Sequence, residues 1–226
     1  KQDGEYYDIY RDGLKIYTSI DSRMQKHAEK AVEAHFKSYL QEAFDKNNKK
    51  CKNPPFSNDI SRIQIDTIIN KSLRQSMFYK KLIGKACSYC ERPKKYIQKV
   101  DNGYECSYCG TISPSYTKIE IDKKLNSKRK IKVFDWNSEN FEKDTLFSAR
   151  DSVKYYKGLL RSGVMSMDPH SGQIKAWVGG PNFKHFKYDM VSKGKRQVGS
   201  TFKPFVYATA LESGVVDPCY KVPDIE

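Results

Sequence analysis

The sequence lacks long apolar runs, is poor in cysteine and histidine, and contains no low-complexity tract. No stretch approaches the roughly 18 consecutive apolar residues of a membrane-spanning helix, which excludes a predicted span within these residues. Six cysteines in 226 residues are too few for a fold built mainly on disulfides. A hydrophobic content of 38% nevertheless excludes a wholly disordered chain, so we expect a packed core.

Acidic residues are also scarce relative to basic ones. The chain has 41 Lys and Arg against 27 Asp and Glu, a formal net charge of +14. Much of the excess lies in residues 71–132, which hold 16 basic and 5 acidic residues. Such a charge favours anionic surroundings, namely nucleic acid, phospholipid head groups or an acidic polymer, without choosing among them.

Hydrophobic periodicity predicts two helices in the first third of the chain. Alternating residues in LKIYTSID indicate a strand, after which apolar residues recur at helical spacing, namely Met24, Ala28, Ala31, Val32, Phe36 and Leu40. Asp21 or Ser22 is suited to cap this helix. A polar loop with a Pro-Pro pair follows, and residues 61–80 form the second predicted helix.

The remaining chain alternates strands and helices around an interruption. KIKVFDW reads as a strand resumed after residues 81–130, which we therefore interpret as an insertion. A helix is expected over residues 148–161, and GVMSMDPHSGQIKAWVGG has the turn residues of a hairpin.

The segment RQVGSTFKPFVYATALESG carries a Ser-x-x-Lys pattern at a predicted helix start. Gly199 permits a tight turn, and Pro204 is tolerated only in a first helical turn, so Ser200 opens the helix and Lys203 shares its face. A serine hydroxyl becomes nucleophilic when a base takes its proton, and a lysine of lowered pKa serves as that base. We predict Ser200 as nucleophile and Lys203 as base or proton relay. The residue types alone also allow a capping serine beside a solvated lysine.

The chain resembles the class A bifunctional penicillin-binding proteins in three segments that occur in the family's order. These segments are LKIYTSIDSRMQKHAEKAV, MDPHSGQIKAWVGG and RQVGSTFKPFVYATALESG. Val198 stands where the family often has Pro, which leaves Ser200 and Lys203 in register. The resemblance implies an α+β fold like that of serine β-lactamases, incomplete here, with an antiparallel sheet flanked by helices. Residues 1–80 would be the linker and the N-terminal part of the transpeptidase domain, and residues 131–226 its core with the S-x-x-K helix.

The resemblance also implies a reaction. Ser200 would attack the penultimate D-Ala carbonyl of a peptidoglycan stem peptide and release the terminal D-Ala. An amine of a neighbouring strand would then resolve the acyl-enzyme, and β-lactams would acylate the same serine. No cofactor is expected for catalysis. The family's S-x-N and K-[TS]-G motifs have no suitably placed copy before Glu226, so we expect this chain alone to be inactive.

The resemblance further implies a longer parent protein. We expect a truncated chain, preceded in the parent by a glycosyltransferase domain and a membrane anchor. The working location would then be extracytoplasmic, at the periplasmic face of the inner membrane.

Four of the six cysteines form two C-x2-C pairs, separated by 15 residues, within the predicted insertion. Such spacing predicts a tetrahedral structural zinc site in a zinc-ribbon-like insertion, with Cys87, Cys90, Cys106 and Cys109 as ligands. Two disulfides or one redox pair are the alternative, because thiols oxidise outside the cytoplasm. Three roles of the basic insertion stay open, namely binding of a cell-wall assembly protein, contact with anionic glycan or lipid, or stabilisation of the inserted loop by the metal, and nucleic acid is not expected as its partner.

Two other classes of function remain open at this stage. A basic zinc-ribbon protein that binds nucleic acid would explain the insertion but leave the three segments unexplained. A non-catalytic penicillin sensor or a β-lactamase would share S-x-x-K, and the lifetime of the acyl-enzyme separates a β-lactamase from a transpeptidase.

Overall fold

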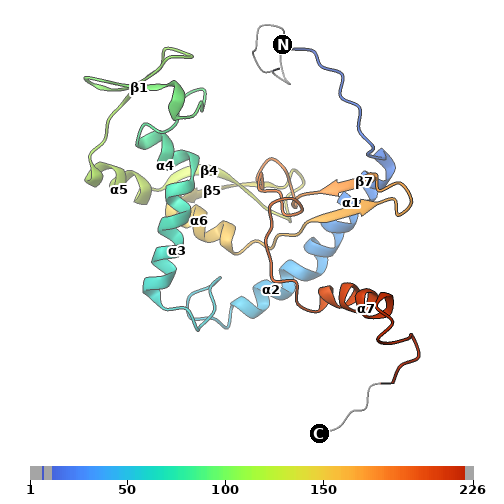
Figure 1. Cartoon of the computed structure of the whole chain (residues 1–226). Coiled ribbons are helices and arrows are strands. Elements are labelled where there is room, and N and C mark those ends of the chain that lie inside the picture. Colours follow the sequence, from blue (N-terminus) through green and yellow to red (C-terminus); the bar gives the residue numbers. More distant parts are fainter. Residues whose placement is uncertain (1–6, 8–11, 222–226) are drawn as a thin grey trace. The chain divides into compact units, whose positions relative to one another are not determined.

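The computed structural model describes residue 7 and residues 12–221, and the chain forms two compact units, Lys1–Val191 and Ser192–Glu226 (Figure 1). The start of the predicted linker region 1–80 and the end of the predicted transpeptidase core 131–226 therefore lie outside the described residues. Within the described part of the chain, every helix is too short or too polar to cross a bilayer.

The N-terminal helical run consists of α1 (Ser22–His35), a π-helical turn (Phe36–Leu40) and α2 (Gln41–Asn48). The predicted cap is confirmed at Asp21, whose carboxylate accepts hydrogen bonds from the backbone N–H groups of Arg23 and Met24. Val32 and Phe36 are buried, whereas Met24 is exposed. The predicted apolar face is therefore buried mainly in its second half.

The strand predicted before α1 is wrong, because residues 13–21 form no strand. Only the end of this segment lies against the edge of β7 (Ile174–Val178), where the Ser19 hydroxyl donates to the Ile174 carbonyl at 2.7 Å and the Asp21 N–H donates to the Lys175 carbonyl at 2.9 Å. The Gln25 side chain then takes the place of a strand backbone. Its Oε1 accepts from the Trp177 N–H at 2.7 Å and its Nε2 donates to the Trp177 carbonyl at 3.0 Å. Because the start of α1 covers this edge of β7, the segment before α1 cannot pair with β7 as a strand.

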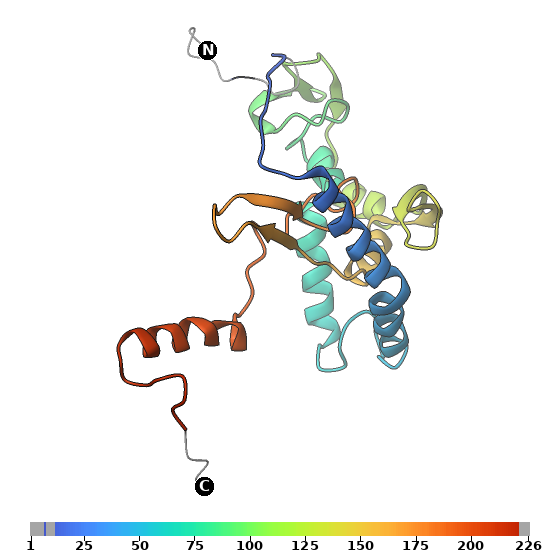
Figure 2. The same ribbon diagram turned by 90° about the vertical axis from the view of Figure 1, so that its right-hand side faces the viewer.

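The predicted hairpin is confirmed. β6 (Val164–Met167) pairs antiparallel with β7, and α1 lies along β7 in both views (Figures 1 and 2). At the turn the Asp168 carbonyl accepts from the Gly172 N–H, and Gly172 has a φ of +70°, which favours glycine.

The second predicted helix is split in two. α3 (Arg62–Gln75) and α4 (Met77–Leu82) are separated by Ser76, whose ψ of 147° is extended. The Ser76 hydroxyl donates to the Leu73 carbonyl at 2.6 Å and accepts from the Tyr79 N–H at 3.2 Å. One side chain thus closes α3 and caps α4.

Two apolar clusters form the core of the first unit. α3, α4, α5 (Lys118–Asn126) and α6 (Ala149–Lys157) build one, in which Leu82 and Leu125 are buried. β4 (Arg129–Phe134) and β5 (Glu142–Phe147) pair antiparallel, and β4 contributes to the other cluster. Its buried members are Val32, Phe36, Phe134, Trp136, Val178 and Phe186. The predicted strand at KIKVFDW and the predicted helix over 148–161 are confirmed, although α6 ends at Lys157.

The cysteine-bearing segment is a small antiparallel sheet of β1 (Ile97–Val100), β2 (Gly103–Cys106) and β3 (Ile112–Pro114), preceded by a 3₁₀ turn (Lys94–Tyr96). The α+β class is therefore confirmed. The described strands form three separate small sheets, however, where the sequence suggested one sheet flanked by helices.

Gln41 is a buried polar residue that joins α2 to the end of α6. It is 6% exposed, its Nε2 donates to the Gly158 carbonyl at 2.8 Å, and its Oε1 accepts from the Leu160 N–H at 3.0 Å. Gln41→Ala leaves both backbone groups without a partner, so we expect a loss of roughly 2–4 kcal/mol in unfolding free energy. Urea unfolding measures it, with the exposed Gln98→Ala as control. A loss equal to that of the control would contradict this account.

Candidate active site and metal centre

Ser200 and Lys203 lie in the second unit, at the start of its helical run. A 3₁₀ turn (Gly199–Phe202) leads directly into α7 (Lys203–Glu212), with Pro204 in the first turn of α7. Gly199 has a φ of +53°, as expected of a glycine that permits a tight turn. The predicted helix start at Ser200 is therefore confirmed.

The spacing of three residues places the two side chains on one face of the helix start. The Ser200 carbonyl accepts from the Lys203 N–H, which fixes the turn between them, and both residues are exposed within this unit. A helix N-terminus favours developing negative charge through its unpaired amides and its dipole. The local geometry suits a serine nucleophile with a neighbouring lysine. Their catalytic roles stay predictions.

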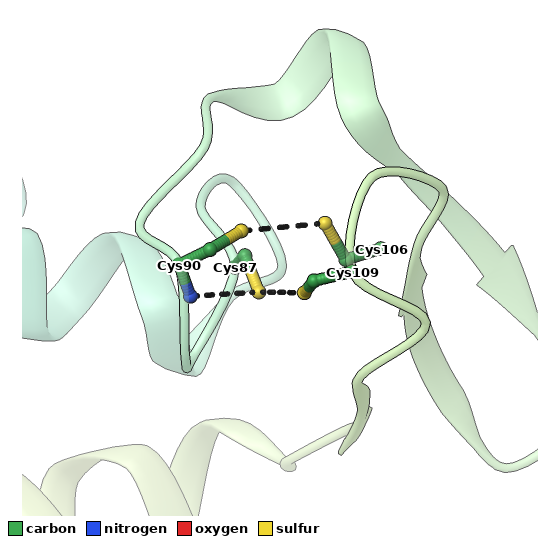
Figure 3. Close-up of side chains that lie close together, drawn as sticks. All are labelled: Cys87, Cys90, Cys106 and Cys109. Carbon is green, nitrogen blue, oxygen red and sulfur yellow. Dashed lines mark hydrogen bonds between the residues drawn. The ribbon is translucent and has the colours of Figure 1, made fainter. Parts of the chain in front are cut away.

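The four predicted zinc ligands lie together (Figure 3). Their Sγ atoms are all within 4.8 Å of one another. The closest pairs are Cys87 with Cys109 at 3.5 Å and Cys90 with Cys106 at 3.7 Å. A tetrahedral zinc with Zn–S bonds of about 2.3 Å separates its sulfurs by about 3.8 Å. The four thiols are thus spaced to hold one metal ion, and all are free cysteines.

Backbone turns set the positions of both cysteine pairs. The N–H groups of Tyr89 and Cys90 donate to the Cys87 Sγ at 3.4 Å each, which curls the first pair around that sulfur. The second pair continues from the end of β2, and Gly110 donates its N–H to the Cys106 carbonyl at a φ of +69°. Cys87 and Cys106 are buried, Cys90 is half-buried and Cys109 is exposed, so the cluster is covered on one side and open on the other.

The four sulfurs influence one another's ionisation. The Thr111 hydroxyl and amide lower the pKa of the Cys109 thiol to about 6. The Arg92 amide favours the Cys90 thiolate, but burial and the three neighbouring sulfurs together raise its pKa to about 12. Four sulfurs this close cannot all carry a negative charge without a cation between them.

Tyr156, His185 and Glu142 form a hydrogen-bond chain that the sequence did not predict. The Tyr156 hydroxyl accepts from the Phe134 N–H at 3.1 Å and forms a second hydrogen bond with His185 Nδ1, 3.0 Å away. His185 Nε2 then donates to Glu142 Oε1 at 2.8 Å. The hydrogen bond from the Lys184 ammonium and that from His185 lower the pKa of the Glu142 carboxyl. This chain fastens the loop after β7 to β5 and α6. No local pattern would have revealed it, because its members are far apart in sequence.

Comparisons with known proteins agree with this architecture. Residues 113–160 match the family model of the penicillin-binding protein middle domain, and residues 162–225 match that of the penicillin-binding protein transpeptidase domain. The chain belongs to the penicillin-binding proteins, as its resemblance implied. The middle-domain match begins inside the predicted insertion 81–130, whose boundaries stay a prediction.

Among curated proteins, the chain is similar to penicillin-binding protein 1A of several bacteria. It is 28% identical to that of Rickettsia typhi over 219 residues, covering 92% of this chain and 24% of the relative. The protein of Rickettsia prowazekii is also 28% identical, over 231 residues with the same coverage. That of Pseudomonas aeruginosa is 44% identical over 54 residues, which are 24% of this chain and 7% of the relative. The chain thus spans about a quarter of the length of its Rickettsia relatives. No solved structure matches it.

Proposed function

We propose that this chain supplies the nucleophile helix of a serine D,D-transpeptidase that crosslinks peptidoglycan stem peptides. The observation that carries the proposal is the transpeptidase match over residues 162–225, which includes Ser200 and Lys203 at a helix start. The penicillin-binding family implies β-lactams as ligands of the same site. A nucleic-acid-binding role is disfavoured, because it would leave both penicillin-binding protein matches unexplained.

The proposed reaction begins with attack of the Ser200 hydroxyl on the penultimate D-Ala carbonyl. Its proton passes to Lys203, and then to the departing D-Ala, which leaves an acyl ester on Ser200. An amine of a second stem peptide resolves the ester. The Ser200 backbone N–H is one donor to the oxyanion, and a strand bearing K-[TS]-G supplies the other. Because that motif is not among these 226 residues, the chain alone is inactive in this proposal.

The test is covalent labelling of a protein that joins this chain to a complete transpeptidase domain. Incubation with a fluorescent penicillin should give one adduct, which peptide mapping by mass spectrometry places on Ser200. An adduct on another residue would contradict the assignment. Rapid loss of the adduct by hydrolysis would instead indicate a β-lactamase.

We also propose that the four clustered cysteines hold a structural zinc ion. The mutual spacing of all four sulfurs supports one shared metal ion over two disulfides. The ion would tie the turn before β1 to the turn after β2, with no part in catalysis. We place the parent protein at the periplasmic face of the inner membrane, where the basic insertion would meet cell-wall assembly proteins.

The zinc ribbon is expected to be dispensable for the rest of the fold. Replacing residues 86–114 with a Gly-Ser linker removes the three-stranded sheet but keeps Leu82 and Leu125, which are buried in the α3–α6 cluster. Thermal unfolding of the remaining structure should therefore change little. The sequence delimits a dispensable insertion as residues 81–130, but replacing that whole range also removes both leucines and the start of β4, so as the matched control it should unfold the domain. If both replacements unfold it, the ribbon is integral to the domain.

A further inference from the structure

A cleft separate from the cysteine cluster lies within the first unit. It has a volume of about 1010 Å³ and runs between α2, the β4–β5 pair and α6. Sites for small ligands and short peptides occupy roughly 300–1,000 Å³, so this cleft is large enough for several residues of extended chain. Neither the proposed transpeptidase site nor the proposed zinc site uses its lining.

Trp136 lines the cleft and has an unsatisfied donor. The side chain is 4% exposed, and its indole Nε1 has no hydrogen-bond partner among the described residues. Phe134 packs edge-on against the ring at 4.9 Å between centroids, and Phe36 lies at 6.0 Å, so the ring is held in place. An indole N–H can only donate, and leaving it unpaired is costly. The Nε1 atom is itself buried, and Trp136 also lines a second cavity with Val178 and Phe186, so the ring belongs to the wall that the two cavities share.

The acidic side chains of the cleft are already engaged. Glu42 pairs with Lys46 at 2.8 Å, and Asp135 pairs with Lys143 at 3.3 Å. Asp45 accepts from the Gln41 amide, and Asp151 accepts from the Ser148 hydroxyl and backbone N–H.

Four lysines of the cleft have no ion pair among the described residues. They are exposed side chains from α2 and the π-helical turn, the segment before β4, and α6, namely Lys37, Lys49, Lys128 and Lys154. Apolar side chains lie between them, including Pro54, Pro55, Phe147 and Leu159. Asp45 and Asp151 keep their charge, so the six lysines and four carboxylates of the lining give the cleft a net charge of +2 beside its apolar surface.

We propose that this cleft binds a short acidic peptide segment. Its carboxylates would meet the four lysines, and its apolar side chains would contact the prolines and Phe147. Lysine suits this ligand because its ammonium is a flexible point charge on an apolar stem. A peptide supplies in one ligand both the negative charges that the lysines attract and the apolar groups that the prolines and Phe147 can contact.

The test titrates the ¹⁵N-labelled 226-residue chain with the acetylated tetrapeptide amide Glu-Leu-Glu-Glu and follows the indole N–H signals. The chain has two tryptophans, so a Trp177→Phe variant assigns the Trp136 signal. We expect a saturable shift of the Trp136 signal. The charge-reversed peptide Lys-Leu-Lys-Lys should give none.

Matched variants separate the cleft from general attraction to a basic protein. Lys128→Gln/Lys154→Gln should weaken binding at least about tenfold. Lys132→Gln/Lys157→Gln removes the same charge from exposed positions in β4 and α6 outside the cleft, and should leave binding unchanged. Equal weakening by both pairs, or no saturable shift at millimolar peptide, would overturn the proposal. A saturable shift with tetragalacturonate but not with the peptide would overturn it in favour of an acidic glycan.

Discussion

Replacing Ser200 with alanine is expected to abolish covalent labelling by a fluorescent penicillin, in a protein that joins this chain to a complete transpeptidase domain. The reason is chemical, because the acyl ester needs the Ser200 oxygen. Intact-mass measurement should show the full adduct on the unmodified protein and none on the variant. Lys203→Ala should slow acylation by about 10²- to 10⁴-fold, the usual contribution of a positioned base.

The controls lie on the same helical run. Ser213 follows α7, and its hydroxyl donates to the Ala210 carbonyl at 2.9 Å, so Ser213→Ala should leave labelling unchanged. Circular dichroism should show both active-site variants folded, because exposed residues of a first helical turn contribute little to a core. A persistent adduct on the Ser200→Ala protein would remove Ser200 as nucleophile and, with it, the transpeptidase proposal.

Loss of zinc is expected to unfold the ribbon and leave the helical core folded. The three short strands of the ribbon have few buried apolar residues, so the metal would hold the segment together. Cys90→Ser should lower the metal content from one zinc ion per chain to well below one. Backbone amides of residues 86–114 should then exchange rapidly with deuterium, while those of α3 and α6 stay protected.

Two other cysteines provide the control for this experiment. Cys51 and Cys219 lie outside the cluster, so Cys51→Ser and Cys219→Ser should keep the zinc and the exchange pattern. Protein purified without reducing agent decides between the two interpretations of the cysteine pairs. Four thiols paired as disulfides, with no metal bound, would contradict the zinc proposal.

Short sequence patterns correctly predicted the features that depend only on neighbouring residues. The cap at Asp21, the turn after Asp168 and the helix start at Gly199 each depend on a few neighbouring residues. Prediction failed where a distant partner intervened. The alternation in LKIYTSID did not produce a strand, because Gln25 occupies the β7 edge where a ladder would extend. The break at Ser76 could not be predicted, because it depends on the directions that α3 and α4 must take to pack into one core.

The sequence by itself determined the family, the spacing of Ser200 and Lys203, and the arrangement of four cysteines in two C-x2-C motifs. These are properties of residue identity over short distances, and they hold whatever the packing. Only the tertiary structure decided that the four sulfurs converge within 4.8 Å, that Tyr156, His185 and Glu142 form one chain, and that lysines from three segments border one cleft. The reason is that hydrogen-bond geometry and burial depend on segments far apart in sequence, which meet only when the core packs.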